Sequence, residues 1–315
     1  MTQNVGPGLR MYKVTDPSDD PVNPRPGTLR YGATTIAGKV WISFEGDVLI
    51  KLRRPLLVSS YTAIDGRGAN VRIENGDGFL LREVKNVIIH GLNFHHNQPT
   101  TAGPVVGPGG AVDDHGKSDG DAISIMHSNN IWIDHNTLSQ GQDGLIDVTH
   151  GSTNVTISNN WFMDHDKVML LGHSDTFVED SEMKVTVAFN RFGPNCNQRM
   201  PRVRRGYAHV VNNFYDGWKE YAIGGSMNPS ITSQANVFVA PESNKEVAWE
   251  EPGNAKWNFK SVGDGFVNGA RFGQANESQS GPLYASQQMF TVGKQEEVRS
   301  LTRDAGALKC HGKTC

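Results

Sequence analysis

Hydrophobic and polar residues alternate in short segments that recur through the middle of the chain. Each segment has apolar residues at every second position, then a polar pair with asparagine, then an aromatic residue. The copies are NVIIHGLNFHH (86–96), NIWIDHNTLSQ (130–140), NVTISNNWFMD (154–164), KVTVAFNRFGP (184–194), AHVVNNFYDG (208–217) and SITSQANVFVA (230–240). A repeat of this length with an alternation of period two is typical of a solenoid built from β-strands.

The copies follow one another at intervals too short for a helix between strands. Their equivalent positions are separated by 22 to 30 residues after a first gap of 44: Val87, Ile131, Val155, Val185, His209 and Ile231. Turn-forming residues fill the intervals, and a βαβ crossover would need a helix there. We therefore predict an all-β protein, a right-handed parallel β-helix with one coil per copy. Two earlier segments, 39–52 and 61–76, fit as further coils.

An asparagine recurs at the same place in most copies. Stacked side-chain amides can hydrogen-bond to one another and to the backbone at the corners of a coil. The sequence predicts such a ladder, with a structural role for its members Asn136, Asn160, Asn190, Asn213 and Asn236.

The chain as a whole reads as one domain, residues 1–315. The repeat is not recognisable after Pro241, so residues 241–315 are expected to form an irregular C-terminal segment with a helix packed along the coils. The Gly- and Pro-rich segment Pro99–Ser118 is predicted to leave the solenoid as a long loop that ends directly before Asp119.

Charge and hydropathy exclude some partners. Lys and Arg total 30 against 33 Asp and Glu, for a formal net charge of −3, and no long run of one sign indicates a nucleic-acid surface. No apolar stretch is long enough to span a bilayer, so no membrane partner is expected. The first residues also lack the hydrophobic core of a signal peptide.

Four spaced acids stand out, Asp119 and Asp121 in DGDAISI and Asp143 and Asp147 in DGLIDV. Residues two or four apart on a strand point to the same face, and the two pairs are about one coil apart. Carboxylates gathered in this way repel one another unless a cation lies between them, and an oxygen-rich site suits Ca²⁺. The alternative is that both motifs are only turn sequences.

Basic residues follow on the next coils. Lys167 lies in HDKVMLLGHSD, and the segment QRMPRVRRG contains Arg199, Arg202, Arg204 and Arg205 around Pro201. Arginine binds carboxylates with two parallel hydrogen bonds, whereas lysine supplies a point charge. A calcium ion beside these side chains would suit an acidic polysaccharide. The alternative is a solvated basic patch.

These segments resemble the pectate lyases of polysaccharide lyase family 1, most of all the plant enzymes and their pollen-allergen relatives. The resemblance rests on DGDAISI, IWIDHNTLS, DGLIDVTHGSTNVTISNNWF, HDKVMLLGHSD, VTVAFNRFGPN, QRMPRVRRG, HVVNNFYDGW and YAIGGSMNPSI. It extends over roughly residues 12–275 and implies Ca²⁺-dependent eliminative cleavage of α-1,4-linked polygalacturonate in the cell wall by a secreted monomer. It also implies that the N-terminal cap of the family is truncated in this chain.

Roles are implied for individual residues by the same resemblance. Asp121, Asp143 and Asp147 are similar to the primary calcium ligands, and Asp119 to an acid that joins when more calcium binds with substrate. Arg199 is similar to the catalytic base. Lys167 and Arg204 are similar to the residues that bind the substrate carboxylates. The segment IWIDH (131–135) is expected beside the site and supporting it.

Two other functions remain open. A pectin hydrolase would use acids as proton donor and acceptor and would not need Arg199. A binding protein would hold the polysaccharide without turnover.

The remaining chemistry-bearing residues are expected to be structural or peripheral. Cys310 and Cys315 could close a small disulfide loop, which leaves Cys196 as a buried thiol or one whose partner is missing; three reduced cysteines are the alternative. Asn154 and Asn276 begin glycosylation sequences, and Asn276 is the better candidate. The spacing of the histidines follows the repeat and not a zinc pattern, so they are predicted to be coil-surface or stacking residues: His90, His95, His96, His135, His165 and His173.

Overall fold

The structure is a computed structural model that describes residues 2–252, 257–273 and 284–308. Contacts divide the chain into two units. Unit 1 comprises residues 1–147 and 306–315, and unit 2 comprises residues 148–305. Within the described ranges, no helix has the length and apolar content needed to cross a membrane.

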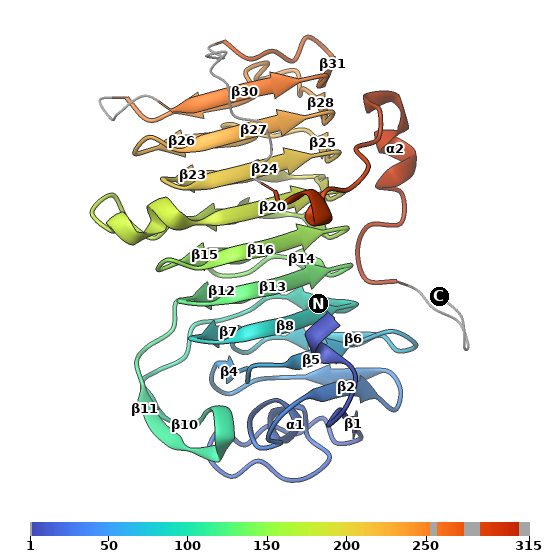
Figure 1. Cartoon of the computed structure of the whole chain (residues 1–315), viewed down its shortest axis with the longest axis vertical. Coiled ribbons are helices and arrows are strands. Elements are labelled where there is room, and N and C mark those ends of the chain that lie inside the picture. The colour runs from blue at the N-terminus through green and yellow to red at the C-terminus, as the bar shows by residue number, and fades with distance from the viewer. Residues whose placement is uncertain (1, 253–256, 274–283, 309–315) are drawn as a thin grey trace. The chain divides into compact units, whose positions relative to one another are not determined.

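Unit 1 contains three sheets of parallel strands, named here A1, B1 and C1 (Figure 1). Sheet A1 is ordered β1 (Arg10–Val14), β2 (Val40–Phe44), β5 (Thr62–Asp65), β8 (Lys85–His90) and β13 (Asn129–Asp134). Sheet B1 contains β4 (Leu56–Leu57), β7 (Phe79–Arg82) and β12 (Ile123–Met126), and β15 (Ile146–Thr149) begins at the end of the unit. Sheet C1 contains β3 (Val48–Ile50), β6 (Val71–Glu74), β9 (Leu92–His95) and β14 (Thr137–Ser139).

Unit 2 repeats this arrangement with sheets A2, B2 and C2. Sheet A2 contains β16 (Thr153–Ser158), β20 (Lys184–Ala188), β24 (Tyr207–Val211), β27 (Ser230–Gln234) and β30 (Asn258–Val262). Sheet B2 contains β19 (Met169–Leu171), β23 (Arg202–Arg204), β26 (Ile223–Ser226) and β29 (Ala248–Glu250). Sheet C2 contains β17 (Trp161–Met163), β21 (Arg191–Phe192), β25 (Phe214–Asp216), β28 (Val237–Val239) and β31 (Gly265–Val267), and β18 (His165–Lys167) pairs with β22 (Cys196–Gln198).

The chain passes from sheet B to sheet A to sheet C in each turn, and connections between parallel strands are right-handed. The predicted right-handed parallel β-helix is confirmed. Alternation explains which side chains are inside: Val40, Ile42 and Phe44 of β2 are buried, while the residues between them are partly exposed. The predicted repeat also gives the correct register where Val87 pairs with Ile131, and Val155 with Val185.

One register differs from the predicted one. Val185 pairs with Ala208, not with His209, and Ala208 in turn pairs with Ile231. A shift of one residue reverses the face on which a strand side chain lies. Ala208 therefore occupies the inward position, and His209 is covered from the other side by Tyr284, whose hydroxyl lies 2.9 Å from its Nδ1 atom.

The asparagine ladder is present. In unit 2, the Oδ1 atom of Asn190 accepts a hydrogen bond from the backbone N–H of Asn160, at 2.8 Å, and Asn213 and Asn236 repeat the pattern on the following coils. In unit 1, Asn136 accepts from the N–H of Leu92 at 3.0 Å. Because all these amides are buried, the ladder satisfies backbone groups that water cannot reach.

The coils continue further than the sequence repeat indicates. Strands β29, β30 and β31 lie within the segment 241–315 that was expected to be irregular. The reason is visible in the ladder, since Asp264 takes the place of asparagine and accepts from the N–H of Asn236 at 2.8 Å. Beyond them come short helices, η4 (Ser286–Gln288), η5 (Gln295–Glu297) and α2 (Val298–Leu301). The expected helix is therefore present but short.

The long loop carries secondary structure of its own. Within the predicted loop Pro99–Ser118, β10 (Gly103–Val106) and β11 (Val112–His115) form an antiparallel pair around η2 (Pro108–Gly110). Near the N-terminus, η1 (Thr2–Asn4) precedes the first strand and α1 (Leu29–Thr34) precedes β2.

Candidate active site

Three of the predicted calcium ligands come together in unit 1. Carboxylate oxygens of Asp119, Asp121 and Asp143 lie within 4.8 Å of one another. Asp119 and Asp121 lie in the extended segment before β12, not within a strand, and Asp143 precedes β15. Asp119 is exposed, Asp143 is half-buried and Asp121 is buried. The cluster is thus open to solvent on one side.

Asp121 is the most perturbed member of the cluster. Its carboxylate accepts hydrogen bonds from the Ser124 hydroxyl at 2.9 Å and from the Gly144 N–H at 2.7 Å. Burial, followed by the negative charge of Asp119, raises the pKa of Asp121 to about 6. The hydrogen bonds act in the opposite direction but do not offset burial. A bound cation would remove the repulsion that disfavours the ionised form.

Asp147 joins this group across Gly144. A Cβ atom added to Gly144 would lie 2.7 Å from the Oδ1 atom of Asp147 and 2.8 Å from the Oδ1 atom of Asp121. Any side chain at this position would therefore enter the space between the two carboxylates. Gly144 was not singled out from the sequence, although its place inside the DGLID segment is a signal that could have identified it.

A further acid, Asp77, binds both ends of the loop Pro99–Ser118 by hydrogen bonds. Its Oδ2 atom accepts hydrogen bonds from the hydroxyls of Thr100 and Ser118, at 2.5 and 2.6 Å. These two residues also bond to each other, because Ser118 N–H donates to the Thr100 carbonyl at 3.1 Å. Both ends of the loop are thereby held next to Asp119. Sequence reasoning missed Asp77 because nothing near it repeats or carries charge of the opposite sign.

The donor set of the acidic cluster fits Ca²⁺. All four predicted ligands offer carboxylate oxygens, which are hard donors. Among the described residues, the group of Asp119, Asp121 and Asp143 contains no histidine or cysteine. The negative charge of Asp119, which adds to the effect of burial in raising the pKa of Asp121, supports the same conclusion.

The predicted basic residues lie in unit 2 on consecutive coils. Lys167 ends β18, and its strand partner Gln198 directly precedes Arg199. Arg199 has a positive φ of 61° and is followed by the cis peptide bond between Met200 and Pro201. This turn redirects the chain at Arg199, whose side chain is half-buried.

Arg204 already has partners in the structure. Its Nε atom donates to Asp175 at 3.1 Å and its Nη1 atom donates to the His173 carbonyl at 3.2 Å. Burial lowers the pKa of Arg204, and the positive charge of Arg202 lowers it further. A carboxylate ligand would relieve this crowding of positive charge.

The two arginines without a predicted role have structural contacts. Arg202 is buried, forms an ion pair with Glu251 at 2.7 Å and lies over the ring of Trp249 at 5.4 Å. Arg205 donates to the backbone carbonyl of Asp175 at 2.7 Å. Their side chains therefore hold loops of unit 2 in place.

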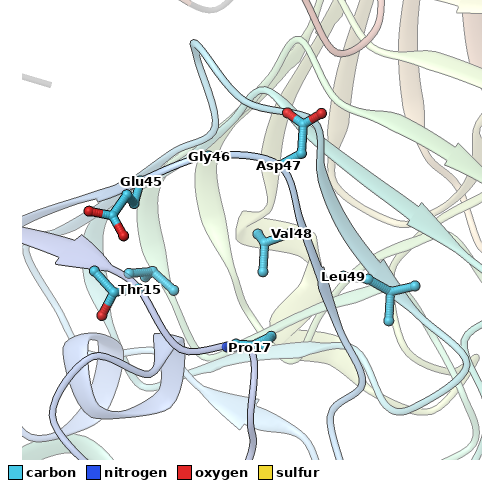
Figure 2. A pocket seen from close by; sticks show the side chains of 8 residues that line it. Thr15, Pro17, Glu45, Gly46, Asp47, Val48 and Leu49 are labelled. Carbon is cyan, nitrogen blue, oxygen red and sulfur yellow. The ribbon is translucent and has the colours of Figure 1, made fainter.

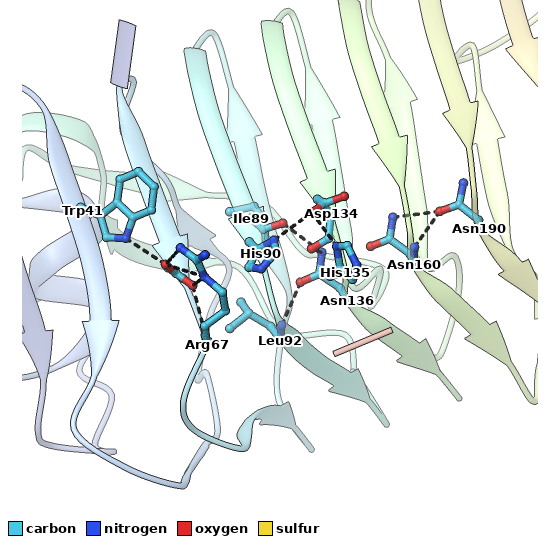
Figure 3. Close-up of polar contacts among 11 residues, drawn as sticks. Trp41, Arg67, Ile89, His90, Leu92, Asp134, His135, Asn136, Asn160 and Asn190 are labelled. Carbon is cyan, nitrogen blue, oxygen red and sulfur yellow. Dashed lines mark hydrogen bonds and ion pairs between the residues drawn. The ribbon is translucent and has the colours of Figure 1, made fainter. Parts of the chain in front are cut away.

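The segment IWIDH does not lie beside the acidic cluster. It forms the end of β13 in sheet A1, whereas the acids lie at the start of strands in sheet B1. Asp134 and His135 contact His90 instead, as Figure 3 shows. The expectation that this segment supports the calcium site was therefore wrong: a strand's sequence does not indicate which of three sheets it joins.

Unit 1 also contains a pocket of about 490 Å³ that none of the predicted site residues lines. Figure 2 shows its walls, which are formed by Val14, Thr15, Pro17, Glu45, Gly46, Asp47, Val48 and Leu49.

Cys196 is a free, buried thiol, and burial raises its pKa to about 12. Cys310, Cys315 and Asn276, which carried the disulfide and glycosylation predictions, lie outside the described residues. Asn154 is exposed near the start of β16.

Comparisons with known proteins agree with this architecture. A profile of the pectate lyase family matches residues 43–300. The probable pectate lyase 16 of Arabidopsis thaliana is 50% identical over 96% of this chain and 77% of its own length. Pectate lyase 1 of Chamaecyparis obtusa is 49% identical over 97% of this chain and 84% of its own length. The crystal structure of jun a 1, the major allergen from cedar pollen, superposes with a TM-score of 0.91 at 48% identity, covering 95% of this chain and 89% of that one.

The parallel β-helix is shared with that solved structure, and the matched profile extends over most of this chain. The chain belongs to the pectate lyase family. It is a polysaccharide lyase, and the predicted family is confirmed.

Proposed function

We propose that this lyase cleaves α-1,4-linked polygalacturonate by Ca²⁺-dependent β-elimination and releases 4,5-unsaturated oligogalacturonides. The single observation that carries the proposal is the cluster of Asp119, Asp121 and Asp143, whose oxygens lie within 4.8 Å of one another. Such a group repels a polyanion unless a cation lies between them. If its carboxylates bind that cation, they are not available as the proton acceptor, and the base must be another residue.

The proposal assigns Ca²⁺ binding to Asp121, Asp143 and Asp147, with Asp119 joining when further calcium binds with the substrate. Ca²⁺ held there would bind the uronate carboxylate and stabilise the negative charge that develops next to it. Ser124 and the Gly144 N–H orient the Asp121 carboxylate.

Arg199 is the proposed base. It removes the proton on C5 of a galacturonate, the electron pair forms the C4–C5 double bond, and the glycosidic oxygen on C4 leaves. Lys167 and Arg204 bind substrate carboxylates, for which Arg204 exchanges its partner Asp175. The ordinary pKa of arginine exceeds about 12, so activity should rise towards alkaline pH. A hydrolase would instead use two carboxylic side chains as acid and base and would not need Arg199.

The proposal includes the setting implied by the family resemblance, namely action outside the cell on demethylated pectin in the wall by a monomeric enzyme. The relatives named above are plant proteins, and their names describe the same activity.

A spectrophotometric assay tests the proposal. Purified chain is mixed with polygalacturonate in Ca²⁺ or in excess chelator, and the ultraviolet absorbance of the unsaturated product is followed. We expect product only with Ca²⁺, and a loss of at least about a hundredfold in kcat for Arg199→Lys, in line with removal of a proton-transfer group. Arg205→Lys is the matched control and should retain activity, because Arg205 donates to the backbone carbonyl of Asp175 and is given no role in the reaction.

Two results would overturn the assignment. Reducing ends without unsaturated product would indicate a hydrolase. Saturable binding of polygalacturonate without any product, at alkaline pH and with Ca²⁺, would indicate a binding protein.

A further inference from the structure

Unit 1 holds a second group of potential metal ligands, on sheet A1 and separate from the acidic cluster. One ligand atom each from His90, Asp134 and His135 lies within 4.8 Å of the other two. His90 ends β8 and Asp134 ends β13, and the two residues are direct partners in the register of the sheet. The proposed reaction gives this group no role.

The chain geometry explains why three residues from two coils meet. Neighbouring residues of a strand normally point to opposite faces. His135 has a positive φ of 51°, which ends the strand and turns its side chain to the same side as Asp134. Asn136 fixes this turn, since its Nδ2 atom donates to the carbonyls of Asp134 at 3.1 Å and Ile89 at 3.0 Å.

The two imidazoles converge on a single carboxylate oxygen, as Figure 3 shows. The Nδ1 atoms of His90 and His135 lie 2.9 and 2.8 Å from the Oδ2 atom of Asp134, and the ring centroids are 5.4 Å apart. An ion about 2.0–2.1 Å from two ligand atoms holds those atoms roughly 2.9–3.4 Å apart at bond angles near 90–109°. The observed distances of 2.9 and 2.8 Å lie at and just below the lower limit of this range, so the ligand atoms need to move apart by only a few tenths of an ångström.

We propose that His90, Asp134 and His135 form a binding site for a divalent transition-metal ion of the Zn²⁺ class. Two imidazole nitrogens and one carboxylate are ligands that such ions prefer over Ca²⁺. The Asp134 side chain is only 4% exposed, whereas His90 and His135 are 16% and 22% exposed. The carboxylate is therefore largely desolvated, whereas the two imidazoles are partly exposed to solvent.

The surrounding charges favour a cation. Asp65 is the register partner of His90 on its other side, and it holds Arg67 in an ion pair of 2.6 Å. Trp41 donates its ring N–H to the carboxylate of Asp65 at 3.1 Å. The positive charge of Arg67 is thus offset by its ion pair with Asp65, and Asp134 adds a carboxylate to the group.

A second histidine pair in the same unit supplies a matched control. Glu74, His95 and His96 form a chain in which His95 lies between the others, with its Nε2 atom 2.5 Å from Glu74 and its Nδ1 atom 2.9 Å from the Nδ1 atom of His96. The residue types are nearly the same, but the three side chains do not surround one point. Loss of His96 should therefore not affect the proposed site.

Titration with metal tests the proposal on the intact chain. The protein is first treated with chelator and then saturated with Ca²⁺, so that carboxylate-only sites are occupied. Zn²⁺ binding is measured by calorimetry and Co²⁺ binding by its visible absorption, which reports nitrogen and oxygen ligands directly. We expect one equivalent to bind, with an affinity at least about tenfold lower in Asp134→Asn and in His135→Ala, and unchanged in His96→Ala.

These measurements of metal binding do not depend on lyase activity. The metal-site proposal can therefore fail while the proposed function holds, and the proposed function can fail while the metal site is confirmed. Absence of a saturable equivalent in the unsubstituted chain would overturn the proposal. So would equal affinity in His135→Ala, whose partly exposed side chain can be removed without opening the core, or a loss of binding in His96→Ala.

Discussion

Gly144 lies where a larger residue would enter the acidic cluster. A methyl group there would lie 2.7 and 2.8 Å from oxygens of Asp147 and Asp121, closer than van der Waals contact allows. For Gly144→Ala we predict that the Ca²⁺ concentration for half-maximal activity rises at least about tenfold, which corresponds to about 1.4 kcal/mol.

The measurement is a calcium titration of the elimination assay. Gly46→Ala is the control, because a methyl group at Gly46 would meet nothing within 4 Å. An unchanged calcium requirement in Gly144→Ala would show that Asp121 and Asp147 do not share an ion.

His209 makes a separate prediction about pH. Burial lowers its pKa to about 4, and its two ring nitrogens contact Tyr284 and Gln234 at 2.9 and 3.0 Å. The unfolded chain binds a proton at this histidine near pH 6.5, whereas the folded chain resists it until about pH 4. Stability is therefore complete above pH 6.5 and decreases as the pH falls towards 4, by up to about 3 kcal/mol.

Urea unfolding at pH 7 and pH 4.5 measures this effect. His209→Gln removes the titrating group, so we expect its free energy of unfolding to fall less between the two pH values than that of the unsubstituted chain. Carboxylates titrate in both proteins and cancel in the comparison. Equal pH dependence would contradict the role given to His209.

Among the elements, the asparagine ladder is built from buried hydrogen bonds. The Oδ1 atom of Asn213 accepts from the N–H and the Nδ2 atom of Asn190 at 2.9 and 3.0 Å, and its Nδ2 atom donates to Asn236 and Val187. Asn213→Ala leaves several of these groups buried without partners. We predict a loss of at least about 3 kcal/mol in the free energy of unfolding.

Chemical denaturation with urea gives that value. Asn70→Ala is the comparison, since Asn70 is exposed and its side chain accepts a hydrogen bond from Asn93 at 3.1 Å. This variant should lose less than about 1 kcal/mol. Similar losses in the two variants would mean that the ladder is not a source of stability.

Strand patterning predicted most of the coils because alternation and asparagine recur together. The same pattern could not show where β30 and β31 lie, since Asp264 replaces the ladder asparagine there. It also misplaced His209 by one residue. His209 lies on the outer face of its strand but is covered there by Tyr284, which is distant in the sequence. Both faces of this strand are therefore covered, and the sequence alone does not distinguish the inner face from the outer one.

The candidate site was predictable to the extent that charge marks it. The four aspartates and the basic segment around Pro201 are visible in the sequence. Gly144 and Asp77 were not, because their effect depends on contacts with other coils. The histidines were predicted to be coil-surface or stacking residues. One of them, His173, lies beside His150, with ring centroids 3.9 Å apart and ring planes tilted by 32°. Convergence of His90 and His135 on Asp134 requires the register of two strands, which spacing alone does not provide.

For the molecule as a whole, calcium should act as a stabilising ligand. An ion that binds only the folded chain raises the free energy of unfolding, by about 2.7 kcal/mol at a hundred times its dissociation constant. We predict that the melting temperature rises with Ca²⁺ in the unsubstituted chain and changes little in Asp121→Asn. Differential scanning calorimetry with Mg²⁺ as the control measures this, and an equal rise in both proteins would place the ion elsewhere.

The asparagine ladder of unit 2 has a net dipole along the stack of coils. The side-chain amides of Asn160, Asn190, Asn213 and Asn236 each donate to the next coil, and the last three also accept from the coil before. Their dipoles therefore add along the stack, and its positive end points at Asp264. Hydrogen bonds in such rows polarise one another. The row therefore ends as a helix does at its N-terminus, with a carboxylate opposite the accumulated positive charge, and a break at any one coil should weaken the bonds on all the others.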